Sequence, residues 1–173
     1  MSAVRSTAPA VLPQLLPHGA GMLLVDRVES LIPGRCLVAA HTVRADEPCF
    51  AAGADDGRLR YPPTLLLESM GQAAALLWMA STAYQHEQVP MLATVRGFRL
   101  LGPVFAGDVV RHRVRLEHCG QQSAMASATT EVDGVRVAEV ESLLAVGRRP
   151  AELPAASAAP GEVASPPTKE KRA

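Results

Sequence analysis

The stretch PPTLLLESMGQAAALLWMASTAY, residues 62–84, decides the fold of this chain. Two prolines open it, and a helix start tolerates proline because the N–H groups of the first turn have no partner inside the helix. A run free of proline follows from Thr64 to about Tyr84, dense in Leu, Ala and Met. Because its apolar residues fill most of the circumference, the stretch predicts a helix that other structure surrounds.

Strand-like segments lie on both sides of this helix. They occupy residues 22–29, 35–43, 91–101, 108–118 and 123–146. A turn at Pro33-Gly34 separates the first two, and a loop rich in Asp, Gly and Pro spans residues 44–63. The last segment predicts a hairpin, because Asp133-Gly134 between alternating runs favours a type I′ turn. One long buried helix with several antiparallel strands predicts an α+β fold, in which a sheet curls around the helix.

Composition narrows the possible functions. The 173 residues carry 17 basic and 17 acidic side chains, so no strong global field selects nucleic acid or an anionic membrane. Aromatic residues make up only 3% of the chain, too few for recognition of single-stranded nucleic acid by stacking. The three cysteines are scattered without CxxC spacing, which favours a reducing cytoplasmic location without disulfides or a zinc site. We therefore expect no nucleic-acid and no membrane partner.

The two ends of the chain differ from its middle. Three prolines interrupt the first nineteen residues, so no signal peptide is expected there. From Arg148 onward the sequence is rich in Pro and Ala and nearly free of branched aliphatic residues. Such a segment buries too little surface to offset its ordering entropy. We expect one domain over residues 1–149 and a disordered tail over residues 150–173.

Glu68 stands alone in the apolar helix. A buried carboxylate costs several kcal/mol unless a function uses it or partners satisfy it, so Glu68 is a candidate functional group. The alternative is a carboxylate satisfied by backbone or water in the core. Gln72 follows one helical turn later on the same face. In the loop before the helix, we expect Asp55 and Asp56 to be solvated. The alternative is that one of them acts as a catalytic base, although an ordinary Asp is a poor base for a carbon acid.

Three arginines alternate with apolar residues in one predicted strand: Arg111, Arg113 and Arg115. Alternation places the three guanidinium groups on one face of the sheet. We expect a solvent-facing surface there, and the alternative is a docking site for an acidic carrier protein.

Several short motifs occur in a fixed order along the chain. They are Leu16-Pro17-His18, LLVDRV (23–28), Pro33-Gly34, EPCF (47–50), LLLESMGQAA (65–74), FAGD (105–108) and VDGVRVAE (132–139). Together they resemble the β-hydroxyacyl-acyl-carrier-protein dehydratases of type II fatty acid synthesis, which have the hotdog fold. The resemblance spans roughly residues 15–147, and it implies a hotdog fold with an antiparallel sheet around a long central helix.

The resemblance implies roles for individual residues. The catalytic Glu of the family falls on Glu68, but its catalytic His falls on Gly53 or Ala54, so that His is missing. The helix-opening Gly of the family is Pro63 here, which has no N–H to polarise a thioester carbonyl.

Other positions take supporting roles in this resemblance. The Thr64 N–H would replace the missing donor at the helix start. Gln72, Thr64 and Phe50 are the expected substrate-binding residues, His18 is expected to be structural, and His41 and His86 lie outside the motif.

The family also implies partners. An acyl carrier protein would present the substrate on phosphopantetheine, no metal or other cofactor is expected, and the subunit would form a homodimer or a heterodimer with a dehydratase paralogue. Three functions follow. The chain is a degenerate dehydratase subunit of fatty acid or polyketide synthesis paired with an intact paralogue, a hotdog acyl-thioesterase that uses Glu68, or a non-catalytic acyl-binding or scaffolding subunit.

Overall fold

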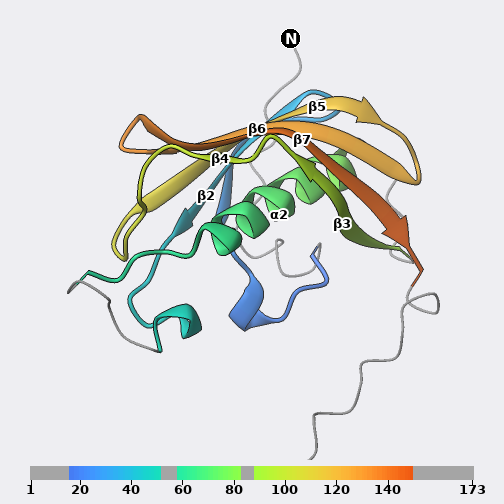
Figure 1. Cartoon of the computed structure of the whole chain (residues 1–173). Coiled ribbons are helices and arrows are strands. Elements are labelled where there is room, and N and C mark those ends of the chain that lie inside the picture. The colour runs from blue at the N-terminus through green and yellow to red at the C-terminus, as the bar shows by residue number, and fades with distance from the viewer. Residues whose placement is uncertain (1–15, 52–57, 83–87, 150–173) are drawn as a thin grey trace, which may run out of the picture.

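A long helix lies in the hollow of a curved antiparallel sheet (Figure 1). The computed structural model describes residues 16–51, 58–82 and 88–149. The helix, α2 (Pro63–Ser81), is preceded by Pro62 as its N-cap residue, as the two opening prolines predict. The expected α+β arrangement, with a sheet curled around a buried helix, is confirmed.

In the described ranges, seven strands form the sheet in the order β1-β2-β5-β6-β7-β3, with β4 beside β7. Their bounds are β1 (Arg27–Ile32), β2 (Cys36–Thr42), β3 (Val89–Arg96), β4 (Arg99–Leu100), β5 (Val109–Cys119), β6 (Ser123–Val132) and β7 (Val135–Arg148). The predicted hairpin joins β6 to β7. Asp133 and Gly134 have φ values of 49° and 79°, and positive φ at both central residues is the mark of a type I′ turn.

The strand boundaries differ from the prediction in two places. The segment predicted at 22–29 begins with a 3₁₀ turn, η2 (Ala20–Met22), and enters the sheet only at Arg27. The segment predicted at 91–101 is broken at Gly97 into β3 and β4. Gly97 has φ +64°, a backbone conformation that favours glycine, and a Cβ there would meet the flexible side chain of Glu141. The predicted loop 44–63 contains a second 3₁₀ turn, η3 (Pro48–Phe50).

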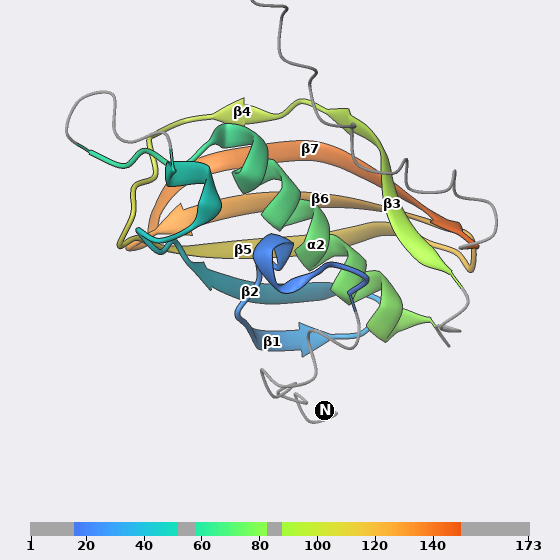
Figure 2. The same ribbon diagram turned by 90° about the horizontal axis from the view of Figure 1, so that it is seen from below.

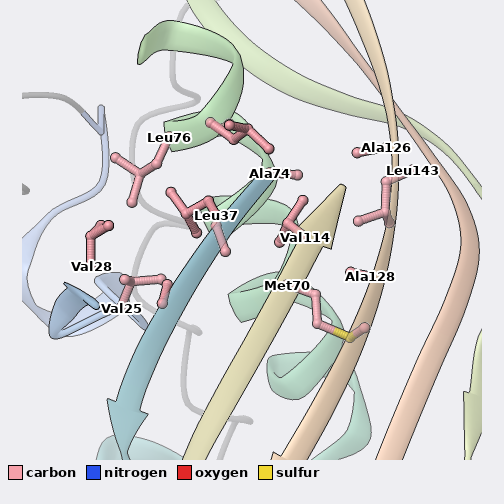
Figure 3. Close-up of a cluster of buried hydrophobic side chains, with 14 of the residues drawn as sticks. Val25, Val28, Leu37, Met70, Ala74, Leu76, Val114, Ala126, Ala128 and Leu143 are labelled. Atoms are coloured by element: carbon pink, nitrogen blue, oxygen red, sulfur yellow. The ribbon is translucent and has the colours of Figure 1, made fainter. Parts of the chain in front are cut away.

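The main core lies between α2 and the concave face of the sheet (Figure 3). Met70 and Ala74 of the helix pack in the same cluster as Leu37, Val114 and Leu143 of the strands. Full burial of such an aliphatic side chain contributes about 1.5–3 kcal/mol relative to exposure. In the described ranges, no helix combines the length and hydropathy that crossing a bilayer requires.

The segment before β1 crosses α2 on the side that faces away from the sheet (Figure 2). Gln72 holds it there: the amide oxygen accepts the Leu24 N–H at 2.8 Å, and the amide nitrogen donates to the Met22 carbonyl at 2.8 Å. The Ser69 hydroxyl adds a hydrogen bond to the Leu24 carbonyl. Polar residues inside an apolar helix thus fix the position of the N-terminal segment.

A second polar connection joins the helix to the sheet. The Nε2 atom of His112 in β5 lies 2.7 Å from the Ser69 hydroxyl, and its Nδ1 atom lies 2.8 Å from the Thr130 hydroxyl of β6. All three side chains are fully buried. Burial lowers the pKa of His112 to about 3, so the imidazole is neutral at neutral pH.

Candidate active site

A pocket of about 520 Å³ opens beside α2. Its walls come from the N-terminal segment, the helix, the edge strand β3 and the C-terminal part of β7. Most of the lining is apolar or small, and the polar side chains are those of His18, Glu68 and Gln72. A largely apolar cavity of this size with a few convergent polar groups is the usual form of a small-molecule site.

Glu68 is held by two nitrogen donors on one oxygen. Its Oε1 atom accepts a hydrogen bond from Gln72 Nε2 at 3.1 Å and lies 3.2 Å from His18 Nε2. The side chains of His18 and Glu68 both remain partly open, at 25% and 33% exposure. Among the residues that the structure describes, none makes a hydrogen bond with Oε2 of Glu68.

These contacts set the charge of Glu68. The hydrogen bond from His18 lowers the pKa of the carboxyl group, and the hydrogen bond from Gln72 lowers it further, against the opposing effect of burial. Glu68 is therefore a carboxylate at neutral pH. It has one oxygen engaged and one without a protein partner in the described ranges, so it can accept a hydrogen bond or a proton from a bound molecule.

His18 reaches Glu68 because Gln72 holds the N-terminal segment against the helix. The two residues are fifty positions apart in sequence, and His18 was assigned a structural role from its place in the Leu16-Pro17-His18 motif. The sequence does carry a signal for a partner of this kind. A lone carboxylate in an apolar helix requires a donor from elsewhere in the chain.

Two of the expected substrate-binding residues do not line this pocket. Thr64 is exposed in the first turn of α2. Phe50 is buried in a second apolar cluster, with its ring centroid 6.3 Å from that of Tyr61. Gln72 does line the pocket, and its amide is already engaged by Leu24, Met22 and Glu68. Substrate binding by these three residues stays a prediction.

The loop that carries the family's His position is outside the described residues. Gly53, Ala54, Asp55 and Asp56 all fall in the gap 52–57, and His86 falls in the gap 83–87.

His41 belongs to a different polar cluster. It is buried, with Nδ1 3.3 Å from Asp26 and Nε2 3.2 Å from Glu47, although the second contact lacks hydrogen-bond geometry. Despite burial, the hydrogen bonds from His41 and the Thr42 N–H hold the pKa of Asp26 well below its usual range. His41 does not line the Glu68 pocket.

The arginine stripe on β5 is matched by carboxylates. Arg111 pairs with Glu29 at 3.2 Å, and Arg113 pairs with Glu131 at 3.2 Å. The third, Arg115, lies 4.0 Å from Glu117. Exposed pairs of this kind contribute little to stability, and they fit the expected solvent-facing surface better than a patch of free positive charge. Within the described ranges, no group of three or more His, Cys, Asp or Glu residues is arranged to hold a metal ion.

Comparison with known proteins places the chain in a family. A family model for the FabA-like domain matches residues 16–141. The 3-hydroxyacyl-acyl-carrier-protein dehydratase FabZ of Anaeromyxobacter sp. (strain Fw109-5) is 34% identical over 161 residues, which cover 88% of this chain and 100% of the relative. The FabZ of Myxococcus xanthus is 37% identical over 135 residues, which cover 76% of this chain and 86% of the relative.

Solved structures agree on the fold. The dehydratase heterocomplex ApeI:P from Xenorhabdus doucetiae aligns with a TM-score of 0.69 and 21% identity, over 84% of this chain and 95% of that chain. A hypothetical thioesterase with coenzyme A from Streptococcus pneumoniae aligns with a TM-score of 0.53 and 11% identity, over 71% and 85%. The expected hotdog fold is thus confirmed. With a family model covering the helix, most of the pocket and most of the sheet, and with FabZ relatives above 30% identity, this chain belongs to the FabA-like dehydratase family.

Proposed function

We propose that this chain is a dehydratase-like subunit for 3-hydroxyacyl thioesters in fatty acid or polyketide synthesis, and that it supplies Glu68 to a site shared with an intact dehydratase paralogue. One observation carries the proposal. Glu68 falls on the family's catalytic carboxylate and lines an apolar pocket with one oxygen available, whereas the family's His position falls on Gly53 or Ala54. The paralogue would supply the missing base.

The chemistry follows from the charge of Glu68. Dehydration breaks a C–H bond at the α-carbon and the C–O bond at the β-carbon, and a carbon–carbon double bond forms between them. The ionised Glu68 accepts a hydrogen bond from the β-hydroxyl and fixes it over the pocket. The partner's base takes the α-proton and returns it to the departing hydroxyl, which leaves as water. Glu68 acts by orientation and electrostatics, because its lowered pKa leaves it ionised at neutral pH, without a proton to donate.

The pocket walls suit an acyl chain. The helix contributes small residues to the lining, Gly71, Ala74 and Ala75. Strand β3 contributes an apolar wall, formed by Met91 and Leu92. An acyl carrier protein would deliver the thioester on its phosphopantetheine arm, and this reaction requires no metal and no redox cofactor.

The partner surface is the edge strand β3. Among the described strands it pairs only with β7, so its other edge offers backbone hydrogen bonds to a further strand. Met91 and Leu92 are exposed on it, at 42% and 38%, and both line the Glu68 pocket. A partner chain added along β3 would cover these side chains and close the pocket. The ApeI:P structure is a dehydratase heterocomplex, which supports a paralogue as this partner over a second copy.

The ionised state of Glu68 also favours a second candidate, an acyl-thioesterase. A carboxylate with a free oxygen in an apolar pocket can take a proton from water, which then adds to the thioester carbonyl while the thiol leaves. This function would need no second catalytic group from a partner.

The Glu68→Gln variant tests the proposal, because it keeps the side-chain volume and removes the charge. Co-expressed with an intact dehydratase paralogue, the variant should still assemble, and dehydration of a 3-hydroxyacyl-pantetheine thioester by the complex should fall by about 10²-fold or more. Glu141→Gln, on an exposed carboxylate of β7, is the matched control and should leave the rate unchanged.

Three other outcomes would contradict the proposal. Full dehydratase activity of the Glu68→Gln complex would show that Glu68 is not used. Normal dehydration by the isolated wild-type chain would show that no partner base is needed. Loss of thioester hydrolysis by the isolated variant would identify the thioesterase instead.

A further inference from the structure

We propose that His18 is a positioning residue for Glu68: its Nε2–H anchors one carboxylate oxygen, so that the other oxygen is presented to the bound substrate. This inference rests on the proposed function, because it assigns a role within the same site. Its key measurement, however, can be made on the isolated chain.

The hydrogen-bond partners of His18 determine where its proton lies. Its Nε2 atom is 3.2 Å from Glu68 Oε1, whereas its Nδ1 atom is buried and meets no hydrogen-bond partner in the part of the chain that the structure describes. A proton on Nδ1 would be a buried donor without an acceptor, which costs about 1–3 kcal/mol. It would also turn the Nε2 lone pair toward a carboxylate oxygen. The neutral tautomer with the proton on Nε2 leaves Nδ1 as an unpaired acceptor and gives the carboxylate a donor.

The chain holds His18 on both sides. Leu16, two residues earlier, is buried at 3% exposure in the main core. Met22 and Leu24, a few residues later, are hydrogen-bonded to Gln72. An imidazole fixed at both ends of a short segment can define the orientation of the carboxylate that it contacts, as supporting residues do in other catalytic sites.

Gln72 completes the arrangement from within the helix. It donates to the same Oε1 atom of Glu68, one turn away. Two donors converging on one oxygen leave Oε2 as the atom with free acceptor capacity. His18 and Gln72 therefore define which oxygen of Glu68 faces a substrate hydroxyl.

Among the lining residues of this pocket that the structure describes, no other charged group is present. Of its lining residues, His18 and Glu68 are the ones that titrate. The helix carries Glu68 as its single ionisable side chain, the lining positions of β3 are Val89, Pro90, Met91 and Leu92, and those of β7 are Leu143 and Ala145. The protonation of Glu68 thus depends on His18 more than on any other charged residue described.

The test uses two substitutions of His18 and one control. His18→Ala removes the donor, and His18→Gln keeps a side-chain N–H that can reach the carboxylate. His118→Ala removes an exposed histidine at the far end of β5 and is the matched control. The carboxyl carbon of Glu68 is followed by NMR during a pH titration of the full-length isolated chain, with the signal assigned by its absence in Glu68→Gln.

An ordinary glutamate titrates near pH 4.3. In the wild-type protein, Glu68 should titrate below that value. In His18→Ala the titration should move to higher pH, because the opposing effect of burial is no longer outweighed. His18→Gln should restore most of the shift, and His118→Ala should not change it. The imidazole ¹⁵N shifts of wild-type His18 at neutral pH should show the proton on Nε2.

Activity of the heteromeric complex provides the functional readout. With a 3-hydroxyacyl-pantetheine thioester, His18→Ala should lower kcat by about ten- to a hundredfold, the range expected when a hydrogen bond to a charged group is lost. KM should change little, and the acid limb of the pH–rate profile should move to higher pH together with the Glu68 titration. A purely structural histidine would not move that limb.

Two results would overturn the inference: an unchanged Glu68 titration in His18→Ala, or a wild-type His18 with its proton on Nδ1. The second result requires no variant, so it decides the question even where His18→Ala does not fold. If the titrations behave as expected and the complex has no dehydratase activity, the positioning of Glu68 stands and the proposed function fails.

Discussion

Glu68 and Ser69 are neighbours in one helix, and each meets a histidine from a distant part of the chain. Ser69 joins His112 and Thr130 in a fully buried chain of hydrogen bonds. Glu68 meets His18 at the edge of an apolar pocket, and both side chains stay partly open. The two contacts point in different directions from the helix axis, one toward the sheet and one toward the pocket.

The difference between them lies in how many polar atoms are left without a partner. Ser69 donates its proton to the Leu24 carbonyl, so it accepts a hydrogen bond from His112 Nε2–H. His112 Nδ1 then accepts from the Thr130 hydroxyl. Every polar group on this side has a hydrogen-bond partner, so these hydrogen bonds form a stabilising connection between helix and sheet. On the pocket side, Glu68 Oε2 keeps acceptor capacity, which a substrate can use.

The largest expected effect on stability comes from breaking the buried hydrogen bonds that join Ser69, His112 and Thr130. His112→Ala should destabilise the protein by about 3–5 kcal/mol, because it creates a cavity and leaves two buried hydroxyls without their partner. Urea unfolding at pH 7 measures the loss, with His118→Ala as the control expected to stay within about 0.5 kcal/mol. A loss below about 1 kcal/mol would show that Ser69 and Thr130 find replacement partners.

Low pH should also lower the stability that the buried His112 contributes. The lowered pKa of His112, about 3, means that the unfolded chain binds more protons than the folded chain below pH ~6.5. Stability therefore falls as the pH decreases from that value, by up to about 1.4 kcal/mol per pH unit from this residue, or roughly 3 kcal/mol by pH 4.5.

Urea titrations between pH 7 and pH 4.5 measure this slope. The lower limit avoids the window below about 4, where Asp26, with its lowered pKa, begins to lose its own stabilising contribution. His112→Gln cannot titrate, so it should show a flatter profile. Parallel profiles for the two proteins would contradict a neutral buried His112.

Sequence patterns were sufficient for the elements, but they did not bring Glu68 and His18 together. The helix, the hairpin and most strands depend on local information: two opening prolines, an apolar run and an Asp-Gly turn. The contact between His18 and Glu68 depends on where a segment without regular structure crosses the helix. Gln72 sets that crossing through two backbone hydrogen bonds to residues about fifty positions away, and no local pattern encodes their register.

The break at Gly97 was missed for a related reason. The backbone at Gly97 has a positive φ, and an added Cβ would meet the side chain of Glu141 of β7. A glycine inside a strand pattern does indicate a bend or close approach, so the signal was present in the sequence. The neighbouring side chain of Glu141, in contrast, comes from a distant part of the sequence and cannot be identified from the local pattern.

A smaller effect is expected from Ser69→Ala. This change leaves the Leu24 carbonyl and His112 Nε2–H without a buried partner, at a cost of about 1–3 kcal/mol. It spares Glu68, His18 and Gln72, so the kcat of the heteromeric complex should remain close to that of the wild type under conditions where both are folded. A drop in kcat that parallels Glu68→Gln would show that the two sides of the helix are not separable.

The smallest effect on stability is expected from Glu68→Gln, the change with the largest effect on activity. The pKa of Glu68 is lowered in the folded protein, so the carboxylate contributes stability above its unfolded pKa, near 4.3, and loses it as the pH falls through its folded pKa. Glutamine keeps the volume and an oxygen for the donors of His18 and Gln72. Since the side chain is 33% exposed, screening reduces the loss to below about 1 kcal/mol at pH 7.

Urea midpoints of wild type and Glu68→Gln at pH 7 and pH 3.5 measure that difference, which should shrink at the lower pH as the wild-type carboxylate is protonated. A variant more stable than the wild type at pH 7 would mean that the folded protein holds the charge of Glu68 at a cost. The hydrogen bonds from His18 and Gln72 would then fail to compensate the burial of Glu68, and its pKa would not be lowered in the folded protein.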